Sequence, residues 1–403
     1  MMESLIAVTV ALGLARLIGT QMPSTPRRIR LQFDRTHDSL PRGKRLSDGM
    51  SAGAAMNDTL WLAHDETLFV ERLRMTKTRG GGVEYAGHRR FDLRKLLALP
   101  ASASNVHPGA SLEADLEGIA IADGCLWLAG SHSAVRDPVG DLPPSKAIAT
   151  LANIRRAGNR FLLARIPMQP GPEGPMLVRE VTLRNGSTVR AARLPGGRKN
   201  NALTRLLRED PHLGPFLAIP SKDNGFDIEG LAVAPGGRVF LGLRGPVIDG
   251  WACVLEIAVT THARRSGELA MQRLPGSARS ARQSVLYRKH FLDLQGAGVR
   301  DLCLAGRDLL VLSGPPMRGK GKARVHRWKN ALAVKRDSML ERREVPTLLE
   351  LPYGEKKNHP EGITIVGQRG NLLGLITIYE SVDDDQRAGR AAIWATLHPL
   401  VMR

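Results

Sequence analysis

Three glutamates recur in this chain within nearly the same local sequence. They are Glu117 in DLEGIA (115–120), Glu229 in DIEGLA (227–232) and Glu361 in HPEGIT (359–364). In each copy the Glu precedes a Gly and an apolar run, which a turn joins to a second apolar run. Carboxylates placed in this way can hold a hard cation such as Ca²⁺, or they can act as general acids and bases.

The hairpin that follows each Glu predicts a second polar group beside it. In two antiparallel strands joined by a turn, the start of the first and the end of the second lie at the same edge. His132 follows Glu117 at the same offset at which Arg244 follows Glu229. We expect His132 to shuttle protons and Arg244 to orient an anionic group. The alternative for His132 is a satisfied structural histidine.

A fourth, degenerate copy at 298–314 carries Arg300 and Asp301 where the others have Glu and Gly. If the copies surround one axis, their carboxylates would repel one another unless a cation or an arginine compensates. Either a divalent cation takes the oxygens, or the arginines pair with them. The predicted catalytic residues are Glu117, His132, Glu229 and Glu361, and the predicted metal ligands are Glu117, Glu229 and Glu361.

The loop SKDNGFD at 221–227 adds further candidates for ligand binding. Its spacing does not match an EF-hand, which needs acids at alternate positions and a closing Glu. The alternative is a turn closed by Asx hydrogen bonds. The predicted ligand-binding residues are Arg244, Arg300, Asp301, Lys222, Asp223, Asn224 and Asp227.

Short strands and turn signals must position these groups. The two clearest hairpins are IAIA-DG-CLWLAG (119–130) and LAVA-PGG-RVFLGL (231–243). A hairpin, an insert and an outer strand recur along the chain, which is typical of propeller blades. We predict an all-β fold, a β-propeller of roughly five to seven four-stranded blades with short helical insertions, one of them at 200–210. Residues 29–403 form this single domain, and residues 1–28 are an extension that is either disordered or a mis-called start.

The composition narrows the classes of partner. The formal net charge is +19, but the basic residues are spread widely and are not interleaved with aromatics, so nucleic-acid binding is disfavoured. The three cysteines stand alone inside apolar runs, which indicates core thiols in a reducing, cytoplasmic compartment. The apolar stretch 4–19 is short for a membrane span, and export through it as a weak signal is the alternative.

Several phrases together resemble a bacterial family known as domain of unknown function 3616. They include DLEGIAIADGCLWLAGSHS, DPHLGPFLAIPSKDNGFDIEGLAV and LGLRGPVIDGWACVLEI, and the resemblance extends over roughly residues 50–400. The family carries no established activity. It is distantly similar to the phytase-like and gluconolactonase-like propellers, which implies channel-facing acids that bind a divalent metal.

The function expected from these observations is binding of a small anionic or sugar-like molecule, with metal-assisted hydrolysis of the esterase, lactonase or phosphatase type as its enzymatic form. The alternative is a non-catalytic scaffold for protein–protein interaction, in which the Glu residues are structural. Solvent access distinguishes the two. Catalytic acids must line an open pocket, whereas structural acids would be buried with their oxygens already satisfied.

Overall fold

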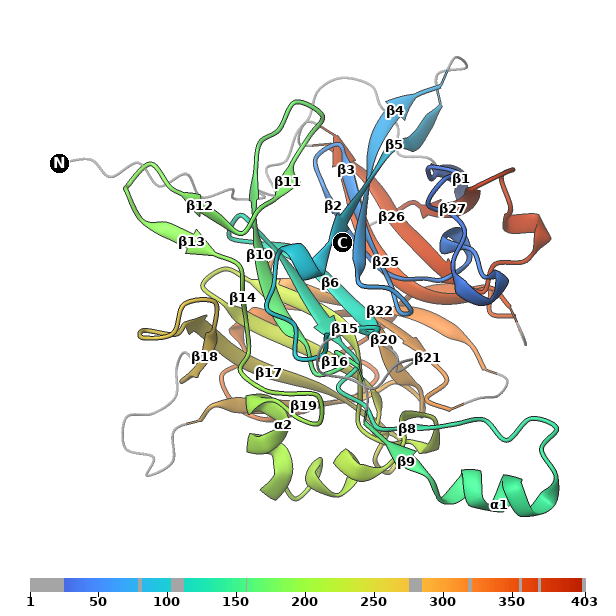
Figure 1. The fold of residues 1–403 in the computed structure, drawn as a ribbon, viewed down its shortest axis with the longest axis vertical. Helices are drawn as coiled ribbons and strands as arrows, with labels where there is room; N and C mark the ends of the chain where they lie inside the picture. Colours follow the sequence, from blue (N-terminus) through green and yellow to red (C-terminus); the bar gives the residue numbers. More distant parts are fainter. Residues whose placement is uncertain are drawn as a thin grey trace.

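The computed structural model describes residues 25–78, 82–102, 112–156, 158–274, 285–317, 321–354, 357–368 and 371–400. Strands dominate it, and they radiate from a common centre in Figure 1. The prediction of a β-propeller is confirmed. Most of the predicted N-terminal extension lies outside the described residues.

Four-stranded antiparallel units make up the propeller. In order from the innermost strand outward, the first is β2 (Met50–Met56), β3 (Thr59–His64), β4 (Phe69–Lys77) and β5 (Val83–Asp92). The second is β6 (Leu116–Ala122), β7 (Cys125–Gly130), β10 (Leu163–Gln169) and β11 (Met176–Leu177). The third is β15 (Asp227–Ala234), β16 (Arg238–Gly245), β17 (Trp251–Thr261) and β19 (Tyr287–Asp293), and the fourth is β20 (Gly298–Ala305), β21 (Asp308–Gly314), β22 (Ala323–Trp328) and β24 (Thr347–Leu351).

The last unit joins the two ends of the chain. It contains β25 (His359–Gln368), β26 (Asn371–Glu380), β27 (Ala392–His398) and the N-terminal strand β1 (Arg27–Gln32). β1 pairs antiparallel with β27, with Ile29 opposite Ala395, and it also pairs in parallel with β5 of the first unit. Among the described strands, the innermost ones contact one another in a closed ring, in the order β2, β6, β15, β20, β25 and back to β2. This closure positions the functional site, because the ring surrounds the central channel.

Smaller elements decorate the sheets. The short strands are β8 (Val135–Arg136), β9 (Ile154–Arg155), β12 (Glu180–Thr182), β13 (Thr188–Arg190), β14 (Ala192–Arg193), β18 (Leu269–Gln272) and β23 (Ser338–Leu340). The α-helices are α1 (Pro144–Ala152) and α2 (Ala202–Leu206). The 3₁₀ turns are η1 (Pro41–Gly43), η2 (Leu46–Asp48), η3 (Leu93–Lys95), η4 (Leu207–Glu209), η5 (Gly214–Ala218), η6 (Ser221–Asp223), η7 (Ala331–Ala333) and η8 (Asp384–Gln386). α2 and η4 confirm the helical insertion predicted at 200–210.

Local sequence explains the inner hairpins. Asp123 and Gly124 join β6 to β7 with φ of 50° and 69°, the left-handed conformation that a two-residue hairpin turn requires. The apolar residues on both faces of these strands are buried, since neighbouring units pack face to face. Phe240 and Val254 of the third unit, for example, lie in one cluster with Val311 and Trp328 of the fourth. Full burial of each such side chain contributes about 1.5–3 kcal/mol.

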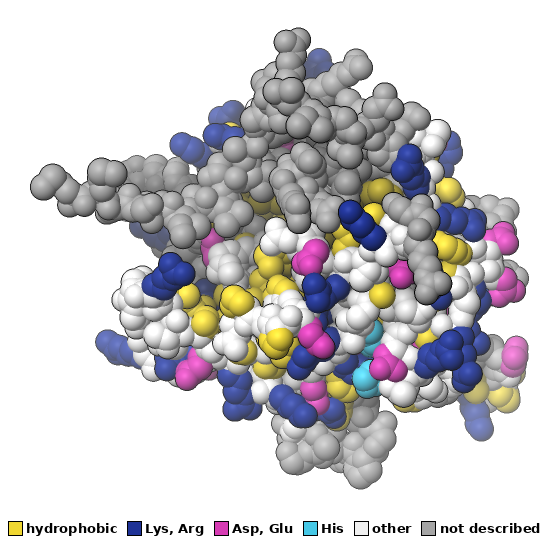
Figure 2. Space-filling view, turned by 90° about the horizontal axis from the view of Figure 1, so that it is seen from above, with side chains coloured by type: hydrophobic (Ala, Val, Ile, Leu, Met, Phe, Trp, Pro, Cys, Tyr) yellow, Lys and Arg dark blue, Asp and Glu magenta, His cyan; other side chains and the backbone are white. Residues whose placement is uncertain are grey.

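Positive side chains are spread over the one face of the molecule that Figure 2 shows. On the face shown in Figure 2, Lys and Arg side chains lie scattered among acidic and apolar ones. Within the described part of the chain, no helix is long and apolar enough to cross a membrane. That the protein does not bind nucleic acid stays a prediction.

Candidate functional site

One β-bulge recurs in every innermost strand and aims one side chain into the channel. The strand pairing skips a single residue in each of these strands. A bulge of this kind leaves its residue unpaired and redirects its side chain. The five bulged residues are Ser51, Glu117, Glu229, Arg300 and Glu361, and all of them line one cavity. Each repeated Glu of the sequence therefore occupies the bulge of its inner strand.

The cavity has a volume of about 270 Å³ and is dominated by acids. Its carboxylates are Asp65, Glu66, Glu113, Asp115, Glu117, Asp227, Glu229, Glu361 and Glu380. Its basic side chains are Arg136, Arg160, Lys222, Arg244 and Arg300. We refer to it below as the acid-lined cavity. The structure thus brings together Glu117, Glu229, Glu361, Arg244, Arg300, Asp227 and Lys222 of the predicted site.

The glycine after the bulge lets the neighbouring inner strand come close. A Cβ on Gly118 would lie 2.5 Å from the Cβ of Leu231 in β15, and a Cβ on Gly230 would lie 2.9 Å from a side-chain carbon of Leu302 in β20. Real side chains do not tolerate such approaches. The Glu-Gly pair therefore combines a side chain aimed into the channel with tight packing between units.

Two arginines neutralise two of the three repeated glutamates. Arg300 Nε lies 2.9 Å from Glu229 Oε2, and the same guanidinium contacts Glu361 through Nη2. Arg244 Nη1 lies 2.7 Å from Glu229 Oε1, while its Nη2 lies 2.5 Å from Asp227 Oδ2. The 2.9 Å contact is an ion pair by distance, although its alignment is not that of a hydrogen bond. Because Arg300 contacts carboxylates from β15 and β25, it ties three inner strands together.

A third arginine pairs with two further carboxylates of the cavity lining. Arg160 contacts Asp115 and lies 2.7 Å from Glu113 Oε1. Burial nevertheless raises the pKa of Asp115 to about 6. It likewise raises the pKa of Asp227 to about 7, in spite of Arg244 beside it. Removal from water thus outweighs the guanidinium groups at both aspartates.

Glu117 differs from the other two repeated glutamates. It is half-buried, and no hydrogen bond or ion pair joins its carboxylate to another described residue. Burial raises its pKa well above the ordinary value, and the neighbouring charges of Asp115 and Glu229 add to this effect. Glu229 and Glu361 are only 3% and 4% exposed. By the criterion of solvent access, Glu229 and Glu361 have a structural environment, whereas Glu117 faces the cavity with its oxygens available.

The pKa of Asp65, another carboxylate of the cavity lining, is shifted in the opposite direction. Burial alone would raise the pKa of its carboxyl. The hydrogen bond and the charge of His64 lower this pKa by more, so the net shift is downward. The His64 Nδ1 to Asp65 Oδ1 distance is 3.0 Å. Glu380 has a raised pKa, because of burial first and then the charge of Asp65. The cavity therefore contains carboxyl groups whose pKa values are shifted in opposite directions.

One group of described residues has the donor set and spacing of a divalent-metal site. The ligand atoms of His359, Glu361 and Glu380 all lie within 4.8 Å of one another. The His359 ring is oriented by a hydrogen bond to the carbonyl of Gly354 and stacks on Tyr353 at 4.9 Å. Orientation by a carbonyl is usual for a metal-binding imidazole. This set shares only Glu361 with the predicted ligands, Glu117, Glu229 and Glu361, and Arg300 contacts this shared carboxylate.

The structure does not place His132 beside Glu117. Its ring lines a separate cavity, where Nδ1 lies 2.7 Å from the carbonyl of Gly130 and Nε2 lies 2.7 Å from Nδ2 of Asn201. Both ring nitrogens are thus satisfied, and burial lowers the pKa of His132 to about 4. This environment is the one expected for the alternative, a satisfied structural histidine, and the proton shuttle stays a prediction.

Replacing His132 by asparagine is expected to destabilise the fold without affecting the acid-lined cavity. Loss of its two hydrogen bonds costs about 1–3 kcal/mol. The lowered pKa means that its stabilisation is present above about pH 6.5 and is lost as the pH falls toward 4. The variant should therefore show a flatter pH dependence of stability between pH 6.5 and 4, measured by denaturant unfolding. Unchanged slopes would contradict this environment for His132.

Three other predicted ligand-binding residues lie outside the lining of the cavity. Asp301 accepts hydrogen bonds from the backbone N–H groups of Leu302 and, at 2.8 Å, of Ile363 in β25. It stands where the other copies have Gly, and it links its unit to the next by a hydrogen bond. Asp223 pairs with Arg136, and the Asn224 side chain bonds both backbone groups of Val247. These side chains tie the loop to β8 and to the segment after β16, and ligand binding by Asp223 and Asn224 stays a prediction.

Several cavity residues escaped the sequence analysis. Ser51 is the fifth bulged residue, but MSAGAAM lacks the Glu-Gly pair that marked three of the other copies. Asp115 stands two residues before Glu117, as Asp227 does before Glu229, and this repeat was visible in DLEGIA and DIEGLA. Asp65, Glu66 and Glu113 had no sequence signal, because only the closed ring brings their segments to the channel.

Comparison with known proteins places the chain in a family. No curated protein matches it. Among solved structures it is similar to glutaminyl cyclase of Myxococcus xanthus, with 8% identity over 92% of this chain and 95% of that one and a TM-score of 0.36. It is also similar to a periplasmic gluconolactonase of Pseudomonas aeruginosa, with 13% identity over 86% of this chain and 83% of that one and a TM-score of 0.29. The model of the family described as protein of unknown function DUF3616 matches residues 49–396, and the chain belongs to this family.

Proposed function

We propose that this protein binds a small sugar-like molecule, neutral or positively charged, in the acid-lined cavity. The observation that carries this proposal is Glu117, a carboxylate that faces the cavity without an ion pair or hydrogen bond to another described residue. A polar group in this state is suited to bind a hydroxyl or an ammonium group of a ligand. The volume of about 270 Å³ is near the lower end for small-molecule sites and suits a ligand the size of one sugar ring.

The charge balance argues against the anionic ligand that the sequence suggested. Arg244 and Arg300 are each held between two carboxylates, and so is Arg160. Their charges are therefore already compensated, while Glu117 has no such partner among the described residues. An anion entering this cavity would find these three guanidinium groups already paired with carboxylates, which disfavours its binding.

The enzymatic form of this proposal is general acid–base hydrolysis. The raised pKa of Glu117 favours its protonated form and suits the general acid, while the lowered pKa of Asp65 suits the base. His359, Glu361 and Glu380 would hold a divalent cation, which would polarise a carbonyl or lower the pKa of a bound water. Arg300 lies against Glu361 and opposes a cation there, so the metal-assisted form is the less favoured of the two.

Binding by the wild-type protein, compared with Glu117→Gln and Glu350→Gln, tests the proposal. Glu350 is an exposed carboxylate on β24, outside the cavity, and serves as the matched control. We expect sugars and amino sugars to raise the melting temperature of the wild type and of Glu350→Gln, but not of Glu117→Gln. Ligand-induced stabilisation that Glu117→Gln leaves intact would overturn the role given to this residue.

The arm formed by β8, α1 and β9 favours the alternative of a protein-binding scaffold. No residue of α1 is buried, and Ile148 and Leu151 are 69% and 50% exposed. The arm projects from the body of the propeller in Figure 1. If it mediates self-association, sedimentation velocity should show a smaller species for Ile148→Ser/Leu151→Ser than for the wild type. A wild type that sediments as a monomer at all concentrations would remove this form of the alternative.

A further inference from the structure

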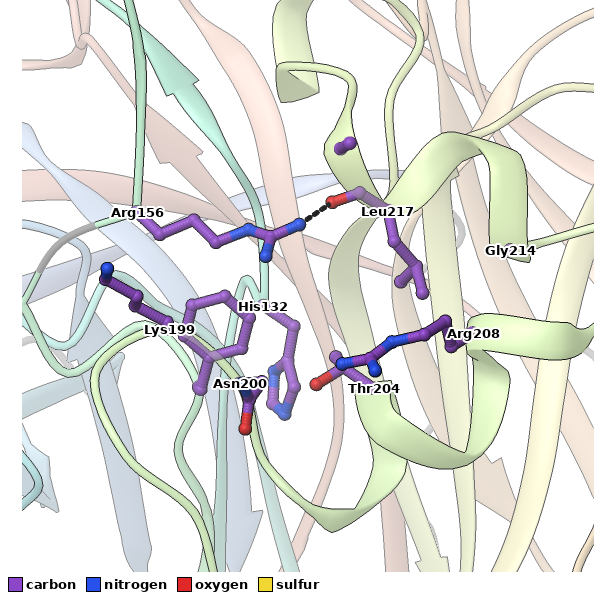
Figure 3. Close-up of a pocket in the computed structure, with 10 residues that line it drawn as sticks. His132, Arg156, Lys199, Asn200, Thr204, Arg208, Gly214 and Leu217 are labelled. Carbon is purple, nitrogen blue, oxygen red and sulfur yellow. Dashed lines mark hydrogen bonds between the residues drawn. The ribbon is translucent and has the colours of Figure 1, made fainter.

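A second cavity, of about 200 Å³, lies beside His132 and has the opposite charge. It is formed by the segment after β9, the loop before α2, and the turns η4 and η5. Figure 3 shows the side chains of Arg156 and Arg208 beside the His132 ring, each from a different segment. We refer to it as the basic cavity.

The basic cavity has three positive side chains and no carboxylate among its described lining residues. The positive groups are Arg156, Lys199 and Arg208, which come from three separate segments. Arg156 donates a hydrogen bond of 2.7 Å to the carbonyl of Leu217, which holds its guanidinium at the rim (Figure 3). The exposed side chains of Lys199 and Arg208 form no hydrogen bond or ion pair with any described residue. This differs from the acid-lined cavity, where carboxylates hold Arg160, Arg244 and Arg300.

The rest of the lining is uncharged and partly apolar. Phe161, Leu217 and Ala218 contribute apolar surface. The His132 ring meets Phe161 edge to face, with centroids 5.8 Å apart. Since Gly130 and Asn201 occupy both nitrogens of His132, it presents carbon atoms rather than a donor to a ligand. The cavity thus combines an apolar wall with a positively charged rim.

We propose that the basic cavity binds a small organic anion, a phosphate ester or carboxylate with a compact apolar body. Guanidinium groups recognise phosphate and carboxylate oxygens through charge-assisted, often bidentate hydrogen bonds. The apolar part of the ligand would lie against Phe161 and Leu217. Arg156 and Arg208 supply the anion contacts from two sides, and Lys199 adds a point charge at the rim.

The proposal is independent of the function proposed for the acid-lined cavity. The two cavities have no lining residue in common, although both draw on the segments 132–136, 156–160 and 217–222. Variants of Glu117 and of Arg156 therefore test different sites. Failure of one proposal leaves the other standing.

Titration calorimetry with phenyl phosphate tests the proposal. Inorganic phosphate and phenol serve as separate probes of the charged and the apolar half. The variants are Arg156→Gln and Arg208→Gln, and the control is Arg343→Gln, which removes the same charge from an exposed residue of the η7–β24 region outside the cavity. Glu117→Gln serves as a control for the acid-lined cavity.

We expect phenyl phosphate to bind more tightly than inorganic phosphate or phenol, and Arg156→Gln and Arg208→Gln each to weaken it about 10-fold. Arg343→Gln and Glu117→Gln should leave it unchanged. Equal weakening by Arg343→Gln would mean non-specific attraction to a basic protein and would overturn the proposal. So would the absence of binding by a folded wild-type protein, or binding as tight in Arg156→Gln/Arg208→Gln as in the wild type.

Discussion

Replacing Arg300 by methionine is expected to lower the free energy of unfolding by about 3–5 kcal/mol, the cost of removing one partner from a buried ion pair. Arg300 is 7% exposed and contacts Glu229 and Glu361, which are buried on neighbouring inner strands. Without it, Glu361 loses its ion-pair partner and Glu229 retains only Arg244. Denaturant unfolding at pH 7 measures the loss.

Two comparisons establish the cause of this loss. Arg190→Gln removes an arginine from an exposed pair with Glu180 and should cost less than about 1 kcal/mol. Adding Glu361→Gln to Arg300→Met removes the stranded carboxylate and should recover part of the stability. If the double variant is no more stable than Arg300→Met, the loss comes from packing and not from the uncompensated charge.

Replacing Glu117 by glutamine is expected to stabilise the protein and to abolish ligand binding in the acid-lined cavity. Burial and nearby carboxylates raise the pKa of Glu117, so the folded state holds this proton more tightly than the unfolded chain. Stability from Glu117 is then complete below its ordinary pKa and is lost as the pH rises through the raised pKa. Glutamine cannot ionise, so the gain, about 0.5–2 kcal/mol, should appear at pH 8 and vanish near pH 4.

For the control variant, Glu350→Gln, we expect the opposite change in stability. Glu350 lies in solvent, and its hydrogen bond to Arg324 lowers its pKa. Glu350→Gln should therefore lose a little stability at pH 8 instead of gaining it. Melting temperatures of both variants between pH 4 and 8 test the difference. A Glu117→Gln variant that is less stable than the wild type at pH 8 would show that this carboxylate has a compensating partner.

Sequence periodicity predicted the part of the site that belongs to repeated hairpins. Glu117, Glu229, Arg300 and Glu361 occupy equivalent bulges, so one local pattern places all four at the channel. Pairing of the arginines with the carboxylates was one of two solutions that charge repulsion left open. The Glu-Gly signal was specific because it combines a bulge with a close approach between strands.

Groups that depend on distant segments could not be predicted. His132 has φ of 57° and bonds Asn201, which begins the α2 insertion, so a chain contact outside the hairpin sets the direction of its ring. Asn201 is itself fixed by a reciprocal hydrogen-bond pair with Thr204 at the start of that helix. Ser51 shares the bulge but neither the charge nor the glycine of the other copies, so no pattern of residue types could reveal it.

The most direct test of the central claim is calorimetric titration of one sugar scaffold in three charge states: glucosamine, glucose and glucose 6-phosphate. Each is titrated into the wild type and into Glu117→Gln at low ionic strength. If the acid-lined cavity takes a neutral or cationic sugar-like ligand, glucosamine should bind most tightly and glucose next, and both should lose binding in Glu117→Gln. Tightest binding of glucose 6-phosphate, weakened by Glu117→Gln, would contradict the account.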